Sequence, residues 1–226
     1  MGFPGGKGKT YPHVINLMPR HRVYIETHLG SGAVMRHKRP AERNIGIDTD
    51  DRVIARWGQS AEAYPGLELY CTKAETFLTR YPFSGEELIY VDPPYHPATR
   101  RRRRVYRHEY SEADHGDLLK LLVSLPCKVI VSGYSNSMYE HALGQWRTQV
   151  FRAKTHTDVR LETLWLNFEP PTDLHDTRYL GGDFRERERT KRRLGRLQQK
   201  LLRMEPKERA AIAKWLYQTF PSTPES

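Results

Sequence analysis

The stretch Asp92-Pro93-Pro94-Tyr95 combines the groups needed to hold a flat polar molecule. It follows the apolar run LIYV, which predicts a position at the end of a buried strand. The two prolines fix the backbone and lack N–H donors, so carbonyl acceptors are held rigidly between a carboxylate and an aromatic ring. A planar molecule with an exocyclic amine would donate hydrogen bonds to Asp92 and a proline carbonyl while its ring stacks on Tyr95. A rigid turn that binds nothing is the simpler alternative.

Two further apolar runs end in residues suited to a nucleoside. Glu26, Gly30 and Gly32 follow the first run, and glycines in such a turn let the backbone approach a ligand closely. Asp48 ends the second run, where a carboxylate can accept hydrogen bonds from ribose hydroxyls. Each has a purely structural alternative, because the glycines can serve the turn alone and Asp48 can cap the next helix. Together they predict a ligand that contains a nucleoside, although the third glycine of a dinucleotide fingerprint is absent.

The N-terminal Gly8-Lys9-Thr10 matches only the end of a phosphate-binding P-loop. The full pattern, G-x-x-x-x-G-K-[ST], requires a glycine where this chain has Phe3. A P-loop also follows a buried strand, and too few residues precede this segment to form one. The sequence therefore argues against an ATPase of this type, and Thr10 is expected to cap a helix that starts near Pro12.

A sheet is required to bring these strand ends together. Strand-like runs occupy residues 22–26, 44–48, 67–71, 88–92 and 128–133, and helical patterns lie between them at 50–58, 73–78 and 111–125. Ser111 and Asp114 form a capping-box pattern at the start of the last helix. Alternating strands and helices predict a doubly wound, mostly parallel α/β sheet. Two later runs without a helix between them, 146–151 and 160–168, predict an antiparallel hairpin at the sheet edge.

The sequence predicts four segments. Residues 1–169 form the α/β domain, and the Pro-, Asp- and Gly-rich residues 170–183 form a linker. Residues 184–220 form a basic helical hairpin, because Leu194, Leu197 and Leu201 recur at helical spacing and Pro206 opens a second helix. Residues 221–226 form a disordered tail.

Positive charge is concentrated in two segments of this chain of net charge +10. Residues 100–107 carry +6 and residues 184–209 carry +7, so the remainder sums to −3. Such segments suit a polyanion, although the mixed Arg/Glu composition of the second also fits a solvated basic face. Cys71 and Cys127 are the two cysteines, which argues against a disulfide framework and a cysteine-based zinc site, and no metal is expected. No apolar run reaches the roughly 18 residues of a membrane span, so a soluble, cytoplasmic protein is expected.

Taken together, DPPY, the glycine turn after Glu26 and the N-terminal PGGK resemble the Dam-type adenine-N6 DNA methyltransferases, especially the short phage-type members. The resemblance covers most of residues 1–168, including SGYSNSMY and ETLWLN. It implies a Rossmann-like fold of the S-adenosylmethionine-dependent methyltransferase type. It also implies methyl transfer from S-adenosyl-L-methionine to adenine N6 in double-stranded DNA, with the adenine flipped out, as in phage and restriction-modification systems.

The resemblance assigns roles to individual residues. Those implied to bind S-adenosyl-L-methionine are Phe3, Gly5, Gly6, Lys7, Glu26, Gly30, Gly32, Asp48 and Asp92. Those implied to hold the adenine and promote catalysis are Asp92, Pro93, Pro94 and Tyr95. The arginines that follow this turn are expected to neutralise DNA phosphates around the flipped nucleotide; they are Arg100, Arg101, Arg102, Arg103, Arg104 and Arg107.

The chain departs from the family pattern at three places. Thr27 and His28 replace the usual Pro-Phe, and Lys73 stands where an acid is usual. Only 44 positions separate Asp48 from Asp92, which leaves no room for the target-recognition region of larger members. Methylation of adenine in RNA remains an alternative, as does an inactive, basic DNA-binding protein on a methyltransferase core. Cytosine-N4 and glutamine methylation are less favoured, since Ser or Asn more often precedes the two prolines there.

Overall fold

The computed structural model describes residues 8, 10–59, 64–99, 107–154 and 159–220. The chain divides into two compact units, Met1–Thr177 and Arg178–Ser226. The described helices of the first unit are α1 (Tyr11–Ile15), α2 (Ala33–His37), α3 (Asp51–Gly58), α4 (Ala74–Arg80), α5 (Glu112–Ser124) and α6 (Ser137–Ala142), with a short 3-10 turn η2 (Pro97–Thr99). Its described strands are β1 (Val23–Glu26), β2 (Arg43–Asp48), β3 (Leu67–Cys71), β4 (Glu87–Val91), β5 (Lys128–Gly133), β6 (Arg147–Lys154) and β7 (Val159–Leu166).

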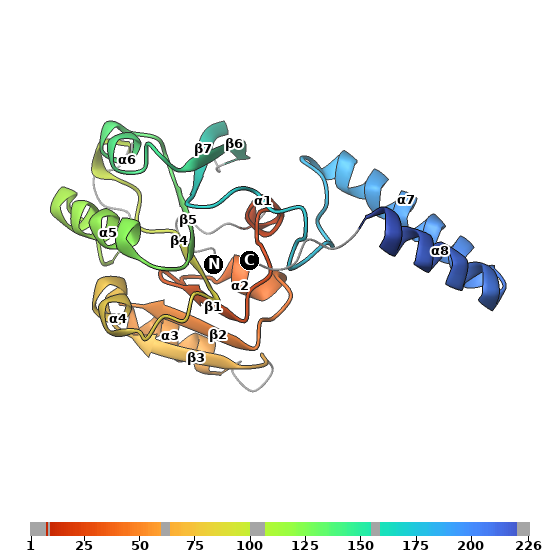
Figure 1. The fold of residues 1–226 in the computed structure, drawn as a ribbon. Helices are drawn as coiled ribbons and strands as arrows, with labels where there is room; N and C mark the ends of the chain where they lie inside the picture. The colour runs from red at the N-terminus through yellow and green to blue at the C-terminus, as the bar shows by residue number, and fades with distance from the viewer. Residues whose placement is uncertain (1–7, 9, 60–63, 100–106, 155–158, 221–226) are drawn as a thin grey trace. The chain divides into compact units, whose positions relative to one another are not determined.

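These strands form one sheet in the order β3-β2-β1-β4-β5-β7-β6 (Figure 1). The first five strands along the chain pair in parallel, whereas β7 runs antiparallel to both β5 and β6. The predicted doubly wound, mostly parallel sheet with an antiparallel edge hairpin is therefore confirmed. Strand order reverses between β1 and β4, and ligands of such sheets bind beyond the carboxyl ends of the strands at this switch point.

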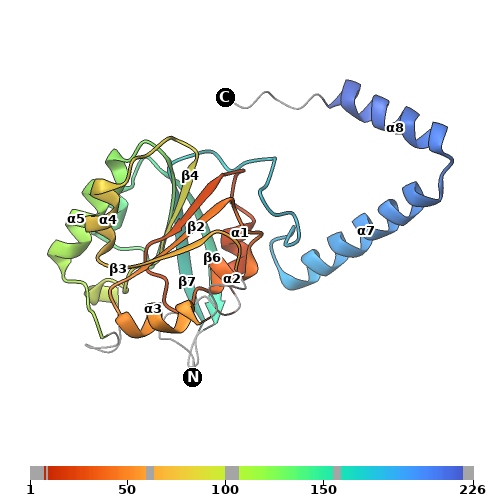
Figure 2. The ribbon, with the colours of Figure 1, turned by 90° about the horizontal axis from the view of Figure 1, so that it is seen from below.

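Alternate side chains of the parallel strands build a core on one face of the sheet. Ile25, Ile47 and Ile89 pack there with apolar side chains of α4, α5 and α6. Figure 2 shows α4 and α5, in yellow and green, on the opposite side of the sheet from α1 and α2, in red and orange. The predicted capping box at α5 is confirmed: Ser111 Oγ accepts from the Asp114 amide, and the Asp114 carboxylate accepts from the Ser111 amide.

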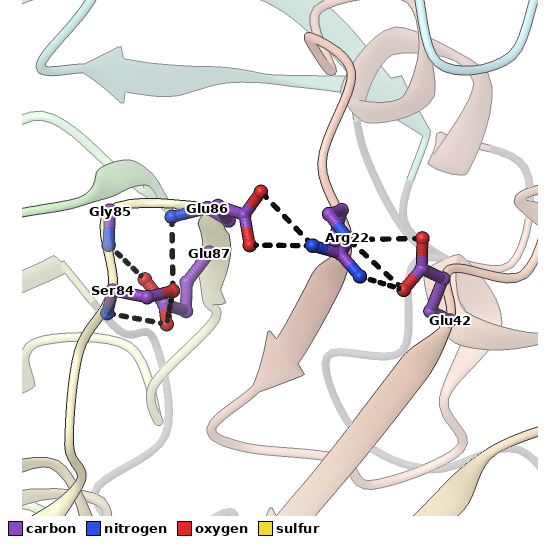
Figure 3. A network of polar contacts seen from close by, with 6 residues as sticks. All are labelled: Arg22, Glu42, Ser84, Gly85, Glu86 and Glu87. Atoms are coloured by element: carbon purple, nitrogen blue, oxygen red, sulfur yellow. Dashed lines mark hydrogen bonds and ion pairs between the residues drawn. The ribbon is translucent and has the colours of Figure 1, made fainter.

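A polar network secures the amino ends of β1 and β4, far along the strands from the switch-point loops (Figure 3). The guanidinium of Arg22 donates to Glu42 and Glu86, with the shortest Arg22–Glu42 contact at 2.8 Å. Beside it the buried carboxylate of Glu87 accepts from the amides of residues 84 and 85 and from the Ser84 hydroxyl. Three donors satisfy this buried acid, so its role is structural.

The end of the first unit folds back onto the domain through residues 174–176. Leu174 forms a bridge with Pro19, and the Arg39 amide donates to Asp176 Oδ2 over 2.9 Å. The ring of His175 stacks on that of His21, with centroids 3.9 Å apart. The predicted linker, residues 170–183, therefore includes a segment that packs as part of the first unit.

The second unit consists of two helices, α7 (Phe184–Arg203) and α8 (Pro206–Thr219). Asp183 caps α7 by accepting from the Glu186 amide, and Pro206 occupies the first turn of α8 as predicted. Neither helix buries a residue completely. Large apolar side chains stay exposed on both, including Trp215 at 55%.

Thr10 occupies the predicted N-cap position of α1, but its side chain makes no capping hydrogen bond. The predicted disordered tail, residues 221–226, lies outside the described residues. Within the described part of the chain, no helix combines the length and apolar character needed to cross a membrane.

Candidate functional site

The turn that follows β1 is connected to both neighbouring strands. The Thr27 amide donates to the Tyr90 carbonyl of β4 over 3.1 Å, and the Leu29 amide donates to the Ile47 carbonyl of β2 over 2.9 Å. Gly30 and Gly32 adopt positive φ angles of 47° and 59°, which favour glycine. The turn therefore lies at the switch point, and its two glycines are required by its backbone.

The two glycines face different surroundings. A Cβ on Gly32 would lie 2.0 Å from the Trp57 ring, so this glycine lets α3 pack against the start of α2. A Cβ on Gly30 would meet no atom of the described residues within 4 Å. The open space beside Gly30 is consistent with the predicted close approach of a ligand, whereas Gly32 has a structural reason of its own.

Asp48, at the end of β2, is bonded to this turn. Its Oδ2 accepts from the Gly30 amide over 2.8 Å, and its Oδ1 accepts from the Asp50 amide over 2.9 Å. Burial raises the pKa of Asp48, and the two amide hydrogen bonds partly offset that rise. Each carboxylate oxygen has a second lone pair, so Asp48 can accept further hydrogen bonds. The N-cap of α3 is Asp50, so Asp48 does not cap this helix; its two hydrogen bonds instead hold the turn.

Glu26 is buried at the end of β1. Its Oε2 accepts from the Tyr24 hydroxyl over 2.9 Å and from the Met35 amide over 3.0 Å. Burial raises the pKa of Glu26 to about 8, and the nearby charge of Asp92 contributes to the rise. Oε1 accepts no hydrogen bond from the described residues. A cationic ligand would lower this pKa, because it stabilises the carboxylate form.

The DPPY stretch directly follows β4 and lies beside the Glu26 turn. Glu26 is the register partner of Tyr90, so Asp92 lies just beyond the paired end of β4. Pro93 is buried, while Asp92 and Tyr95 are partly exposed. The predicted Glu26, Gly30, Asp48 and Asp92 therefore meet at one edge of the sheet.

A stack of side chains supports Tyr95. Its ring lies against the ring of Tyr134, with centroids 4.4 Å apart and planes tilted by 35°. The guanidinium of Arg160, on β7, lies over the ring of Tyr134, 5.1 Å from its centroid. It also donates to the Thr99 carbonyl over 3.0 Å. The carbonyl of Tyr134 accepts from the Asn136 side chain over 3.1 Å. These contacts tie the loop that follows β4 to β5 and β7.

His28, which replaces the family's usual phenylalanine, belongs to a hydrogen-bonded chain. Its Nδ1 is 2.9 Å from the Thr27 hydroxyl and its Nε2 is 3.1 Å from the Tyr110 hydroxyl. Tyr110 in turn donates to Glu75 Oε1 over 2.9 Å. Burial lowers the pKa of His28, so the ring is neutral at pH 7. Because Tyr110 donates to Glu75, His28 Nε2 must donate to Tyr110. His28 Nδ1 is then an acceptor, and it competes with the Tyr90 carbonyl, 3.4 Å away, for the single hydroxyl hydrogen of Thr27.

Several predicted site residues lie outside the described residues: Phe3, Gly5, Gly6, Lys7, Arg100, Arg101, Arg102, Arg103 and Arg104. Arg107 is described, and its guanidinium contacts the carboxylates of Asp50 at 2.7 Å and Asp51 at 3.0 Å. Its side chain is 48% exposed, so an outer face remains accessible. A phosphate contact by Arg107 stays a prediction. Among the described residues, no three potential metal ligands lie close enough together to hold a metal ion.

Four of these residues are not predicted as site residues from the sequence: Tyr134, Arg160, His28 and Tyr110. Tyr134 lies within SGYSNSMY, at the carboxyl end of β5, and its position after a predicted strand was the available signal. Arg160 and Tyr110 carry no local pattern that marks them. Their contacts depend on the pairing of β7 with β5 and on the path that leads into α5.

No protein-family model matches the chain, and no curated protein matches its sequence. Solved structures with a similar arrangement include an rRNA methylase from Streptococcus thermophilus, at 10% identity and a TM-score of 0.46, covering 69% of this chain and 92% of that one. The N-methyltransferase NodS from Bradyrhizobium japonicum has 12% identity and a TM-score of 0.48, covering 71% and 94%. The 23S rRNA methyltransferase ErmE has 12% identity and a TM-score of 0.49, covering 77% and 70%. Because these TM-scores are below 0.5, the roles of residues in this chain rest on its own geometry.

Proposed function

We propose that this protein transfers a methyl group from S-adenosyl-L-methionine to the N6 amine of adenine in DNA. The observation that carries the proposal is the position of DPPY at the carboxyl end of β4, next to the Glu26 turn and across the switch point. The turn predicted to bind the nucleoside and the turn predicted to bind the amine thus adjoin each other. Such proximity is what a direct transfer between two bound molecules requires.

The described residues fit S-adenosyl-L-methionine in three respects. Asp48 keeps lone pairs for ribose hydroxyls while the amides of Gly30 and Asp50 hold it in place. Gly30 borders space that no described residue fills. Glu26 is an acid with a free Oε1 lone pair, suited to the cationic methionine part of the cofactor. When bound, this cofactor supplies an electrophilic methyl group on its sulfonium sulfur.

The adenine amine needs activation, because its lone pair is delocalised into the ring. We expect Asp92 and the Pro93 carbonyl to accept hydrogen bonds from the two N6 hydrogens, which draws electron density back onto nitrogen and aims it. As the N6–carbon bond forms and the carbon–sulfur bond breaks, N6 must lose one proton. Asp92 is positioned to accept it, directly or through water.

Tyr95 would stack on the flipped adenine. The ring of Tyr134 lies against that of Tyr95, with centroids 4.4 Å apart, and would help to hold it in place. Removing a base from the duplex costs a few kcal/mol. Stacking on an aromatic ring returns roughly 1–3 kcal/mol per base, which offsets part of this cost. Tyr134 and Arg160 would keep the Tyr95 ring in place without touching the base.

Substitution of Asp92 tests the proposal. Asp92→Ala should abolish methyl transfer to unmethylated DNA and leave binding of labelled S-adenosyl-L-methionine within a few-fold of wild type. The two readouts are radioactive methyl incorporation and equilibrium dialysis. Failure of the wild-type protein to bind the cofactor would favour an inactive DNA-binding protein instead. Near-wild-type activity of Asp92→Ala would contradict the catalytic role.

A further inference from the structure

Helix α7 carries a stripe of cations along its whole length. The stripe consists of Arg185, Arg189, Arg192, Arg196, Lys200 and Arg203. The intervals are four, three, four, four and three residues, which place all six side chains on one helical face. At 1.5 Å per residue the stripe spans about 27 Å.

The described side chains confirm that these cations share a surface. They line two shallow hollows of α7, and Arg192 and Arg196 border both. All six are exposed, and in the described part of the chain none forms an ion pair within 4 Å of an Asp or Glu side chain. Arg185 nevertheless lies close enough to Asp183 to help the Glu186 amide lower its pKa. The helix has nine Lys or Arg and two Glu, a net charge of +7. Glu186 and Glu188 offset only part of this charge, and Glu188 borders the first hollow.

The opposite face of α7 distinguishes between two kinds of anionic partner. Leu194, Leu197 and Leu201 lie there, but only in the later turns. The first turns present Arg187, Thr190 and Lys191 instead. A helix that lies on a membrane buries an apolar face. Here the cation stripe runs along the whole helix and the apolar face does not, which favours a polyphosphate chain over a lipid surface.

We propose that the α7 stripe binds the phosphate backbone of double-stranded DNA. The choice of DNA rests on the proposed function. Seven of the nine cations of α7 are arginines, whose planar guanidinium groups bind phosphate in a bidentate manner. An α-helix of about 10–12 Å diameter fits the roughly 12 Å wide major groove of B-DNA. The deep, narrow major groove of A-form RNA does not admit it.

A charge-matched pair of variants of the full chain tests the proposal. The stripe variant changes Arg189, Arg192, Arg196 and Lys200 to Gln. The control variant changes Lys191, Lys207, Arg209 and Lys214 to Gln, and so removes the same charge away from the stripe. Gln has a helix propensity close to that of Lys and Arg, and circular dichroism checks that the helices persist. A second stripe variant, with Lys in place of the three arginines, keeps the charge.

The measurement is fluorescence anisotropy of a labelled 30-base-pair DNA duplex over a range of salt concentrations, without cofactor. The stripe variant should lose at least about tenfold in affinity, and its slope of log K against log salt should fall by roughly 3–4, since each phosphate contact contributes about 0.9. The control variant should stay close to wild type. The lysine variant should keep the wild-type salt slope, because it keeps the charge, and should lose affinity only modestly through the loss of bidentate contacts. An unchanged slope, or an equal loss in the stripe and control variants, would overturn the proposal.

Two further measurements complete the test. One compares DNA with other anionic partners, and the other distinguishes failure of this inference from failure of the proposed function. Stripe-dependent binding that is tighter to an RNA duplex, or to phosphatidylserine vesicles, than to DNA would also overturn the proposal. Methyl transfer is measured on the same preparations. Wild-type protein that binds DNA through the stripe but methylates no adenine would contradict the proposed function alone. Adenine methylation together with a stripe variant that binds like wild type would contradict this inference alone.

Discussion

The carboxyl group of Glu26 connects the protein core with the candidate cofactor site. Tyr24 and Met35 hold one of its oxygens, and burial raises its pKa to about 8. Lys38 is also buried, with its pKa lowered to about 7 by burial, and its Nζ lies 4.2 Å from the centroid of the Tyr24 ring. Because the pKa of Glu26 is about 8, its protonation state changes within the ordinary working range of pH.

Binding of S-adenosyl-L-methionine should depend on this protonation state. The ionised form of Glu26 attracts a cationic ligand, so affinity should rise with pH up to about 8 and then level off. Glu26→Gln should bind more weakly at pH 8.5 and lose this pH dependence. Isothermal titration calorimetry between pH 6 and 9 measures both effects, and a pH-dependent rise that persists in the variant would contradict the assignment.

The stability of the unliganded protein provides a control with the opposite sign. The pKa of Glu26 is higher in the folded state, so folding favours its protonated form, and its contribution to stability is lost as pH rises from about 4.5 to about 8. Glu26→Gln should therefore raise the unfolding temperature at pH 8 relative to wild type, with a smaller difference at pH 5. Equal shifts at both pH values would indicate a packing effect instead.

The turn between β1 and α2 contains two glycines that should respond differently to substitution. Gly32→Ala places a Cβ against Trp57 at a positive φ, which should cost on the order of 1–3 kcal/mol of stability. Gly30→Ala meets no atom of the described residues, so its cost should be smaller and come mainly from the positive φ. Its methyl group should instead weaken cofactor binding, because it projects where the ligand is proposed to lie. Thermal unfolding and cofactor affinity of both variants test this pair, and the reverse pattern would contradict it.

The loop after β4 depends on Tyr134 and Arg160 for its position. Arg160→Gln removes the contact over Tyr134 and the hydrogen bond to the Thr99 carbonyl. We expect a severalfold lower kcat/KM for DNA with little change in the Kd for S-adenosyl-L-methionine, because Arg160 touches neither molecule. Arg152→Gln, on the paired strand β6, is a matched control. Loss of cofactor binding in Arg160→Gln would indicate a general structural defect.

Local patterns predicted part of this arrangement, and long-range contacts account for the rest. DPPY, the glycine turn and Asp48 each follow a strand, and parallel strands bring their carboxyl ends to one edge, so their proximity could be predicted. The Tyr95–Tyr134–Arg160 stack and the His28–Tyr110–Glu75 chain join residues far apart in sequence. The linker composition around residue 170 gave no sign that Asp176 bonds to Arg39.

The candidate site and much of the positive charge belong to different units of the chain. The switch-point site belongs to Met1–Thr177, whereas α7, with a net charge of +7, belongs to Arg178–Ser226. A protein shortened after Thr177 should fold and bind S-adenosyl-L-methionine like the full chain, because residues 174–176 and the site are retained. Its affinity for DNA should fall at least tenfold. Calorimetry and anisotropy test these expectations, and unchanged DNA affinity would contradict the division.

The modified base that the protein produces is the decisive test of the proposed function. Purified protein is incubated with S-adenosyl-L-methionine and DNA from a methylation-free host, and parallel reactions contain RNA or the Asp92→Ala variant. The nucleosides released by digestion are then identified by mass spectrometry. We predict that wild-type protein yields N6-methyl-2′-deoxyadenosine from DNA and that Asp92→Ala yields none. Little methylation of RNA is expected. Methylation of cytosine, methylation of RNA alone, or no modified base in any reaction would contradict the claim.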